Sequence, residues 1–274
     1  MKLSLSVRIA EGFLSKREAI ISLPELAELA VAAGFDALCM RASQVGVHSP
    51  AEQVAEATRI MQEKNLKVTM VTGDFDIVYN NDQGPRCLRN ITPYVDLAES
   101  LGAPLIRVCV KKEEDFAAAH AAADEAAQRG IRIAHQCHAA SLFETVDQII
   151  ESLNRIDHPN FGLIFEAGNL EECRQPYGPA TIEKLAPWIF NVYLQNQRLN
   201  PDGAITLDTW CHGPVSFDVI PFPEPGGIDF RSVFQGLREI GYDGTVTVHQ
   251  SAPQESGITP LAAATATAAF LRSI

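Results

Sequence analysis

Polar and charged side chains follow several short apolar runs in this sequence. The run at residues 162–165 leads directly into Glu166, and the run at residues 131–135 leads into Gln136 and His138. The last apolar run ends at His249. A buried carboxylate is costly unless a cation, a hydrogen-bond donor or a ligand pairs with it. We therefore expect Glu166 to mark a place where such partners converge.

These residue types could hold a metal ion or transfer a proton. Glu166 and His249, with amide oxygens from Gln136 or Gln195, would form a mixed nitrogen and oxygen site suited to Mn²⁺, Zn²⁺, Mg²⁺ or Fe²⁺. An amide cannot take up a proton, so Glu166, His249 and His138 are the candidate acids and bases. A mechanism with two carboxylate bases is disfavoured, whereas decarboxylation, retro-aldol cleavage or a one-base isomerisation remains open.

Arginines close to the ends of the early apolar runs could serve the same site. Arg8, Arg41 and Arg107 could grip a carboxylate or phosphate of a substrate, because a guanidinium group offers two parallel N–H donors. The alternative is that they pair with Glu166 in a salt-bridged core. The remaining candidates for substrate binding are Gln195, Gln197, Trp210 and His212.

Two histidines and one tryptophan have competing explanations. His135 lies on the opposite face of its run from Gln136, so we expect it to bond a backbone carbonyl group rather than a ligand. Trp210 could stack on a sugar ring or simply pack against the protein. His212 beside it is either part of a loop that closes over the pocket or a structural residue.

The elements that must position these residues alternate along the chain. Runs typical of strands lie at residues 3–9, 35–40, 67–72, 104–110, 131–137, 162–165, 190–195 and 244–249. Helical patterns lie between and after them, at residues 22–34, 49–65, 92–102, 113–130, 141–156, 180–189, 229–241 and 259–273. Eight such pairs predict a parallel sheet closed into a (β/α)₈ barrel, an α/β fold, with residues 1–274 as a single domain.

Helix-start signals support this segmentation. Ser22 and Glu25 have the spacing of a capping box, and Gly34 would end the same helix. Ser141 and Glu144 show the same spacing ahead of another helical pattern. In a barrel of this kind the carboxyl ends of the strands carry the chemistry, which predicts that the polar residues named above meet at one mouth.

Two connections are long for a compact domain, at residues 73–90 and 196–227. Loops of this size are usually lids or binding loops, so both are candidates for contact with a substrate. Within the first, Asp74 and Asp76 could be ordinary turn residues, because aspartate favours turns on backbone grounds alone.

Composition limits the classes of partner. The net charge is −12 and the pI is near 5.0, which disfavours nucleic acid and anionic membranes as partners. No apolar stretch has the length of a signal peptide or a membrane span, and the six cysteines include no C-x-x-C pair. We expect a cytoplasmic protein that acts on a small molecule, with a homo-oligomer left open.

Four segments resemble the second half of the xylose isomerase-like barrels, in the sugar phosphate isomerase and epimerase superfamily: "IRIAHQCHAASLFET", "GLIFEAGNL", "NVYLQNQ" and "GYDGTVTVHQ". The resemblance implies a divalent metal held by Glu, Asp, His and Glu at the ends of strands five to eight, with the two glutamates moving a proton. This sequence differs at each position. Gln136 replaces the first Glu, Glu166 the Asp, Tyr193 or Gln195 the His, and His249 the last Glu.

The resemblance predicts a metal-dependent isomerase or epimerase-like enzyme for a small sugar or sugar-acid derivative. The altered ligands leave two alternatives: a lyase that cleaves C–C or C–O bonds on the same barrel, or a carbohydrate-binding protein without catalysis. The endonuclease branch of the superfamily is a weaker competitor, because the net charge of −12 opposes DNA binding.

Overall fold

A closed ring of eight parallel strands forms the centre of the computed structural model, which describes residues 1–11, 18–73, 82–251 and 257–274. The barrel strands are β1 (Lys2–Ser6), β2 (Ala37–Cys39), β3 (Lys67–Thr72), β4 (Leu105–Val108), β5 (Arg132–Gln136), β6 (Phe161–Glu166), β7 (Ile189–Leu194) and β11 (Thr245–Val248). Strand β11 pairs with both β7 and β1 and so closes the ring. The predicted single-domain (β/α)₈ barrel is confirmed.

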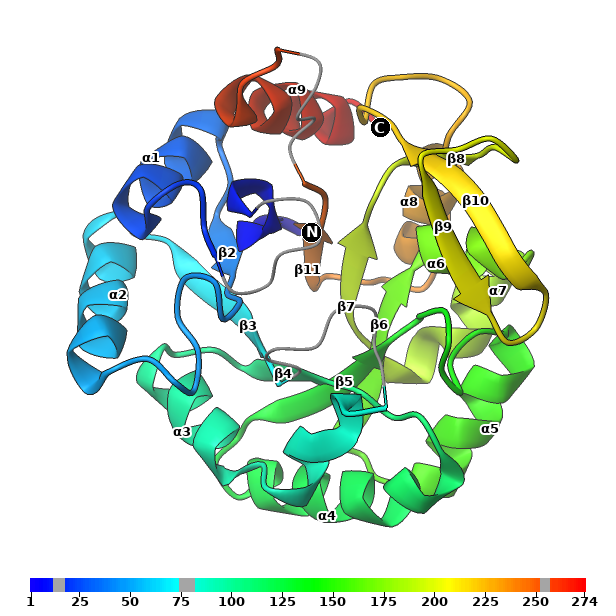
Figure 1. Ribbon diagram of the computed structural model, residues 1–274, viewed down its shortest axis with the longest axis horizontal. Coiled ribbons are helices and arrows are strands. Elements are labelled where there is room, and N and C mark those ends of the chain that lie inside the picture. The colour runs from blue at the N-terminus through cyan, green and yellow to red at the C-terminus, as the bar shows by residue number, and fades with distance from the viewer. Residues whose placement is uncertain (12–17, 74–81, 252–256) are drawn as a thin grey trace.

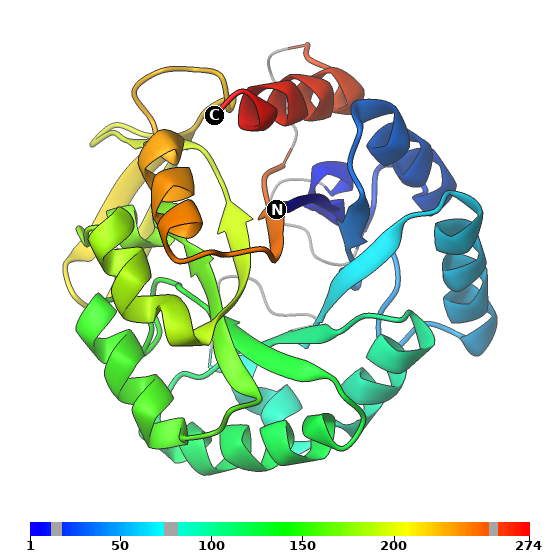
Figure 2. The ribbon, with the colours of Figure 1, turned by 180° about the vertical axis from the view of Figure 1, so that it is seen from behind.

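Helices surround the ring of strands, as Figures 1 and 2 show from the two sides. They are α1 (Leu23–Ala33), α2 (Ala51–Glu63), α3 (Thr92–Ser100), α4 (Phe116–Ala127), α5 (Val146–Ile156), α6 (Ala167–Glu172), α7 (Pro179–Leu185), α8 (Phe230–Glu239) and α9 (Pro260–Arg272). The expected single helix between the sixth and seventh strands is two helices. The first of them, α6, begins directly after Glu166 and was not predicted.

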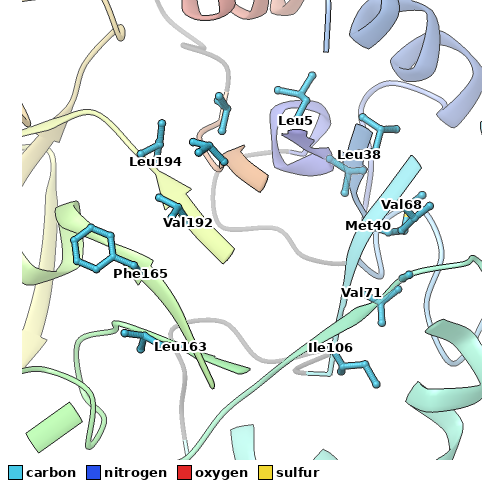
Figure 3. Packing of buried hydrophobic residues seen from close by; sticks show 14 of the residues in the cluster. Leu5, Leu38, Met40, Val68, Val71, Ile106, Leu163, Phe165, Val192 and Leu194 are labelled. Atoms are coloured by element: carbon cyan, nitrogen blue, oxygen red, sulfur yellow. The ribbon is translucent and has the colours of Figure 1, made fainter. Parts of the chain in front are cut away.

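Alternation along each strand divides the core into two parts. Side chains of one parity join the helices in the larger cluster, and Figure 3 labels several of them: Leu5, Leu38, Ile106, Phe165 and Val192. Side chains of the other parity form a second cluster of Cys39, Met70, Leu105, Ala134, Ile164 and Tyr193. Because successive side chains of a strand point to opposite faces, this second set fills the interior of the barrel. The residues next in the same alternation reach its mouth.

Of the capping boxes predicted at Ser22 and at Ser141, the first is present. Ser22 and Glu25 form it, and Gly34 ends α1 in the left-handed conformation at φ 83°. The prediction for Ser141 and Glu144 is wrong, since α5 begins later, with Thr145 as its N-cap. The Glu144 carboxylate instead accepts hydrogen bonds from backbone N–H groups of a distant segment, which are described below.

The long connection after β7 folds into a sheet of its own. Strands β8 (Gln197–Leu199), β9 (Ile205–Thr209) and β10 (Gly213–Val219) form an antiparallel sheet in the order β8, β10, β9. Figure 1 shows it in yellow, outside the barrel and beside α6 and α7. Asp74 and Asp76 of the other long connection lie outside the described residues. Across the described part of the chain, every helix falls short of the length and apolarity needed to cross a membrane.

Candidate active site

The Glu166 carboxylate occupies the carboxyl end of β6 and is buried. Two amide groups hold one of its oxygens, Oε2. Asn169 Nδ2 on α6 donates to it at 2.7 Å, and Gln136 Nε2, at the end of the neighbouring strand β5, donates to the same atom. The side chain that the sequence singled out therefore has a fixed orientation at the mouth of the barrel.

Two arginines from the first half of the barrel, Arg8 and Arg107, act electrostatically on this carboxylate. Burial and the like charge of Arg41 lower the pKa of Arg8 to about 10, while Glu166 and Glu11 oppose the shift. Burial raises the pKa of Glu166 to about 7, and the charges of Arg8 and Arg107 counteract it. These couplings place Arg8 and Arg107 within electrostatic range of Glu166, and Arg41 within range of Arg8.

Arg41 is anchored within the first half. Its Nε donates to Glu11 Oε1 at 2.9 Å, and the hydroxyl group of Ser43 donates to the same oxygen at 2.6 Å. Arg41 and Glu11 are both buried, at 5% and 2% exposure. Their pairing offsets the cost of burying each charge. Sequence reasoning missed Glu11, whose partner comes from a segment 30 residues away.

His249 lies at the junction of the two halves. Its Nδ1 is 3.0 Å from Ser6 Oγ on β1, and its Nε2 is 3.5 Å from Arg41 Nη1. The imidazole ring stacks on Tyr193 with 4.1 Å between ring centroids. The Tyr193 hydroxyl group is 3.2 Å from Cys39 Sγ, and burial raises the pKa of this phenol well above its usual value. Tyr193 is therefore a neutral wall of the mouth.

A second buried carboxylate lies behind Glu166 on α6. Gln195 Nε2 donates to Gln197 Oε1 at 2.7 Å, and Gln197 Nε2 donates to Glu172 Oε1 at 3.0 Å. The other oxygen of Glu172, Oε2, is buried and has no hydrogen-bond partner among the residues that the structure describes. Burial, together with the neighbouring charge of Glu166, raises the pKa of Glu172 to about 8. The signal for Glu172 in the sequence is its place as an acidic residue soon after a candidate site strand.

Two histidines, His135 and His138, lie beside Gln136 in the sequence at the end of β5. The Nδ1 atom of His135 contacts the backbone carbonyl of Gln136, and the ring stacks on Phe143, as expected for a structural histidine. His138 is half-buried, with Nδ1 2.8 Å from the carbonyl oxygen of Ala139.

Trp210 and His212 lie in the turn between β9 and β10. Trp210 is 52% exposed, and Lys111 Nζ lies 5.1 Å from the centroid of its ring. His212 Nε2 is 3.1 Å from the carbonyl oxygen of Cys173, so this ring connects the turn to the end of α6. Within the described part of the chain, neither side chain is hydrogen-bonded to Glu166.

The residues at the mouth do not fit a divalent cation. Glu166 is the one carboxylate among the four expected ligand positions, and the amides of Gln136 and Asn169 both donate to its Oε2 atom. The Nε2 atom of His249 faces the Arg41 guanidinium, and a neutral Tyr193 stands where the resemblance places a histidine. Positive side chains surround the position in which a dication would need negative ligands. In the part of the chain that the structure describes, groups of metal-ligating residues occur elsewhere, at Glu144, Cys173 and Cys211 and at His120, Asp124 and His158.

Solved structures with the same fold cover nearly the whole chain. A probable 3-DHS dehydratase, AsbF, from Bacillus anthracis is 18% identical with a TM-score of 0.71, over 96% of this chain and 97% of that one. D-Allulose 3-epimerase from Methylomonas sp. in complex with D-allulose is 16% identical with a TM-score of 0.69, over 100% of this chain and 96% of that one. The IolI protein with a bound zinc atom is 17% identical with a TM-score of 0.73, over 100% and 97%. Such low identities show a common fold alone.

Comparison at the level of sequence is more selective. No curated protein matches the chain significantly. The family model for the xylose isomerase-like TIM barrel matches residues 27–274, which is most of the barrel and includes all of the second half. The chain therefore belongs to the xylose isomerase-like TIM barrel family.

Proposed function

We propose that this protein is an enzyme that moves a proton at a carbon atom of a small hydroxylated substrate carrying a carboxylate group. Arg8, Arg41 and Arg107 would bind the anionic groups of the substrate, and Glu166 would act as the acid and base. The single observation that carries the proposal is one buried, oriented carboxylate at the mouth of the barrel on which Arg8 and Arg107 act electrostatically, with Arg41 in turn coupled to Arg8.

The electrostatics of the mouth support proton transfer next to a carbonyl or carboxylate group. Removing such a proton places negative charge on an oxygen of the substrate, and fixed guanidinium groups stabilise that charge. A base works best when its pKa lies near the working pH, and burial places the pKa of Glu166 at about 7. The protein's own cations would supply the charge stabilisation for which other members of such barrels use a metal ion.

A one-base isomerisation is the leading reaction. One carboxylate can remove a proton and return it to the neighbouring carbon, whereas the amide of Gln136 cannot act as a second base. The epimerase among the solved structures supports carbohydrate isomerisation as the class of chemistry.

Elimination of water is a second candidate, and His249 favours it. This ring lies beside Arg41 at the end of β11, which only β7 separates from β6, and it could protonate a departing hydroxyl group. The dehydratase among the solved structures is consistent with this alternative.

Proton exchange tests the proposal directly. The protein is incubated in D₂O with D-glucuronate, and with D-glucose as a matched sugar without a carboxylate, and NMR follows deuterium at the carbon next to the carbonyl group. We expect exchange with the acid, none with the neutral sugar, and loss of exchange in Glu166→Gln. A panel of other sugar acids extends the search, and new olefinic signals would identify elimination.

A chelator arm separates the proposal from a metal-dependent mechanism. We expect exchange to persist after dialysis against EDTA and not to rise when Mg²⁺, Mn²⁺ or Zn²⁺ is added back. Exchange that requires an added metal would contradict the proposal. Tight binding of sugar acids without exchange or turnover would instead indicate a carbohydrate-binding protein.

A further inference from the structure

Three segments that are distant in sequence meet beside the mouth at Glu144, Cys173 and Cys211. Glu144 lies in the loop between β5 and α5, Cys173 follows α6, and Cys211 lies in the turn between β9 and β10. One carboxylate oxygen and the two sulfur atoms all lie within 4.8 Å of one another. Glu144 and Cys173 are buried, and Cys211 is half-buried, so one side of the group is open to solvent.

The Glu144 carboxylate is oriented by neutral donors. The N–H groups of Ala140 and Trp210 donate to Oε1 at 2.6 and 2.7 Å, and the N–H of Cys211 donates to Oε2 at 2.8 Å. These bonds fix the carboxylate without neutralising its charge. The thiol of Cys211 also hydrogen-bonds the Glu144 carboxylate, so a cation that replaced the thiol proton would meet a carboxylate oxygen already directed at the sulfur.

We propose that Glu144, Cys173 and Cys211 form a binding site for one thiophilic divalent cation of the Zn²⁺ class. Two sulfur ligands and one carboxylate oxygen are donors that Zn²⁺ prefers, and water from the open side would complete a tetrahedron. With Zn–S bonds of about 2.3 Å and Zn–O bonds of about 2.0 Å, ligand atoms lie roughly 3.3 to 3.8 Å apart. Ligand atoms that lie within 4.8 Å of one another need to approach by up to about 1 Å to reach this geometry.

The exchange of protons for the cation leaves the charge of the cluster unchanged. A cysteine binds a metal ion as its thiolate, so each thiol loses its proton on binding. Binding converts both thiols to thiolates and releases two protons, while the dication adds two positive charges. The cluster carries one negative charge before and after binding, so the buried site gains coordination bonds without a change in net charge.

A cation here would tie the β9–β10 turn to the barrel. The same turn carries Trp210, whose ring lies near Lys111. This site is separate from Glu166 and its arginines, and the proposal does not depend on the proposed reaction.

The other group of metal-ligating residues provides a matched control. His120, Asp124 and His158 lie between α4 and the loop after α5. The Nδ1 atom of His158 accepts the N–H of Asn160 at 2.9 Å, which places the ring proton on Nε2, where it faces Asp124 at 3.0 Å. The nitrogen nearest the group is therefore a donor and is not available as a ligand.

Cobalt absorption tests the site without reference to activity. The full chain is reduced, freed of metal and titrated with Co²⁺, which gives thiolate-to-cobalt absorption in the near ultraviolet when cysteine coordinates it. We expect one equivalent to produce this absorption, Zn²⁺ to displace it, and Zn²⁺ to raise the melting temperature. His120→Ala should behave as the unaltered protein, whereas Cys173→Ser with Cys211→Ser should lose the absorption and weaken Zn²⁺ binding by at least about 100-fold.

Two results would overturn the proposal. The first is a folded, reduced protein that gives no thiolate absorption with Co²⁺. The second is absorption that persists when both cysteines are replaced. Should the double variant fail to fold, Cys211→Ser alone replaces it, because this half-buried turn residue leaves the core intact; retention of full Zn²⁺ affinity in that variant would equally overturn the assignment.

Discussion

The two halves of the barrel bring opposite chemistry to one mouth. The first four strands contribute guanidinium groups, from Arg8, Arg41 and Arg107, whereas the last four contribute the Glu166 carboxylate and the His249 ring. The second half keeps the positions that hold a metal in the family resemblance but has one carboxylate where two or three would be needed. We infer that the first half supplies, as fixed side chains, the positive charge that a metal would otherwise bring.

Replacing the Glu166 carboxylate should have the largest effect on activity of any change that tests this division of charge between the two halves. Glu166→Gln keeps the shape and one hydrogen-bond acceptor but removes the base, so we expect substrate exchange to fall by about 10² to 10⁴-fold. Proton exchange measured by NMR in D₂O reports the loss. Glu171→Gln, on the same helix and more exposed, is the matched control and should retain most of the activity. Equal losses in both variants would indicate damage to α6 rather than removal of a base.

Glu172 tests how a buried carboxylate of the second half affects the free energy of unfolding when its main partner is an amide rather than a cation. Its pKa is raised to about 8, above the ordinary value of 4.5 for glutamate, so the folded state holds a proton that the unfolded state releases. The stability from this group is present at low pH and is lost as the pH rises through about 8. We expect the free energy of unfolding to fall by a few kcal/mol between pH 5 and 9, with Glu166 contributing in the same direction.

Urea unfolding at several pH values measures this effect. In Glu172→Gln the dependence on pH should be flatter, because the neutral amide has no proton to lose, and the variant should gain on the unaltered protein at pH 9. Parallel stability curves for the two proteins would show that Glu172 is not protonated in the folded state.

Removing one cation from the first half should weaken anion binding rather than abolish folding. Arg8→Gln deletes a charged donor, and hydrogen bonds to charged groups contribute about 1.5 to 3 kcal/mol, so D-glucuronate should bind about 10 to 100-fold more weakly. Calorimetric titration gives the affinity, with D-glucose as the uncharged comparison. Arg155→Gln is a suitable control, because this exposed arginine pairs with Glu113 away from the mouth. A similar loss for both ligands would argue against recognition of charge.

Local patterns in the sequence were sufficient to predict the barrel but not all of its polar contacts. Alternating apolar runs identified the eight strands, and parallel strands necessarily deliver Gln136, Glu166 and His249 to one edge. Glu144 shows the limit: its spacing from Ser141 satisfies a capping box, yet its carboxylate bonds Trp210 and Cys211, 66 and 67 residues later. A local signal cannot reveal that a competing donor arrives from a distant hairpin.

Metal ligation shows the same limit in another form. The resemblance pointed to Gln136, Gln195 and His249 as ligands because it compares positions along the strands. The electrostatic environment of those positions depends on arginines from the other half of the barrel. The sequence of the second half carries no information on how close those arginines lie to Glu166. The interactions between side chains of the two halves could therefore be identified only from the three-dimensional structure.

The hydrogen bond between Ser6 and His249 joins the two halves directly and offers the mildest test. Ser6 Oγ on β1 lies 3.0 Å from His249 Nδ1 on the other side of the seam, and both residues are buried. Ser6→Ala should cost about 1 kcal/mol in unfolding and reduce exchange only a few-fold, since the ring keeps its stacking on Tyr193. Ser43→Ala, which removes a hydroxyl bond to Glu11 within the first half alone, should cost similar stability but leave the pH profile of activity unchanged. If Ser6→Ala also leaves that profile unchanged, the orientation of His249 does not contribute to the reaction, and the elimination mechanism loses its candidate acid.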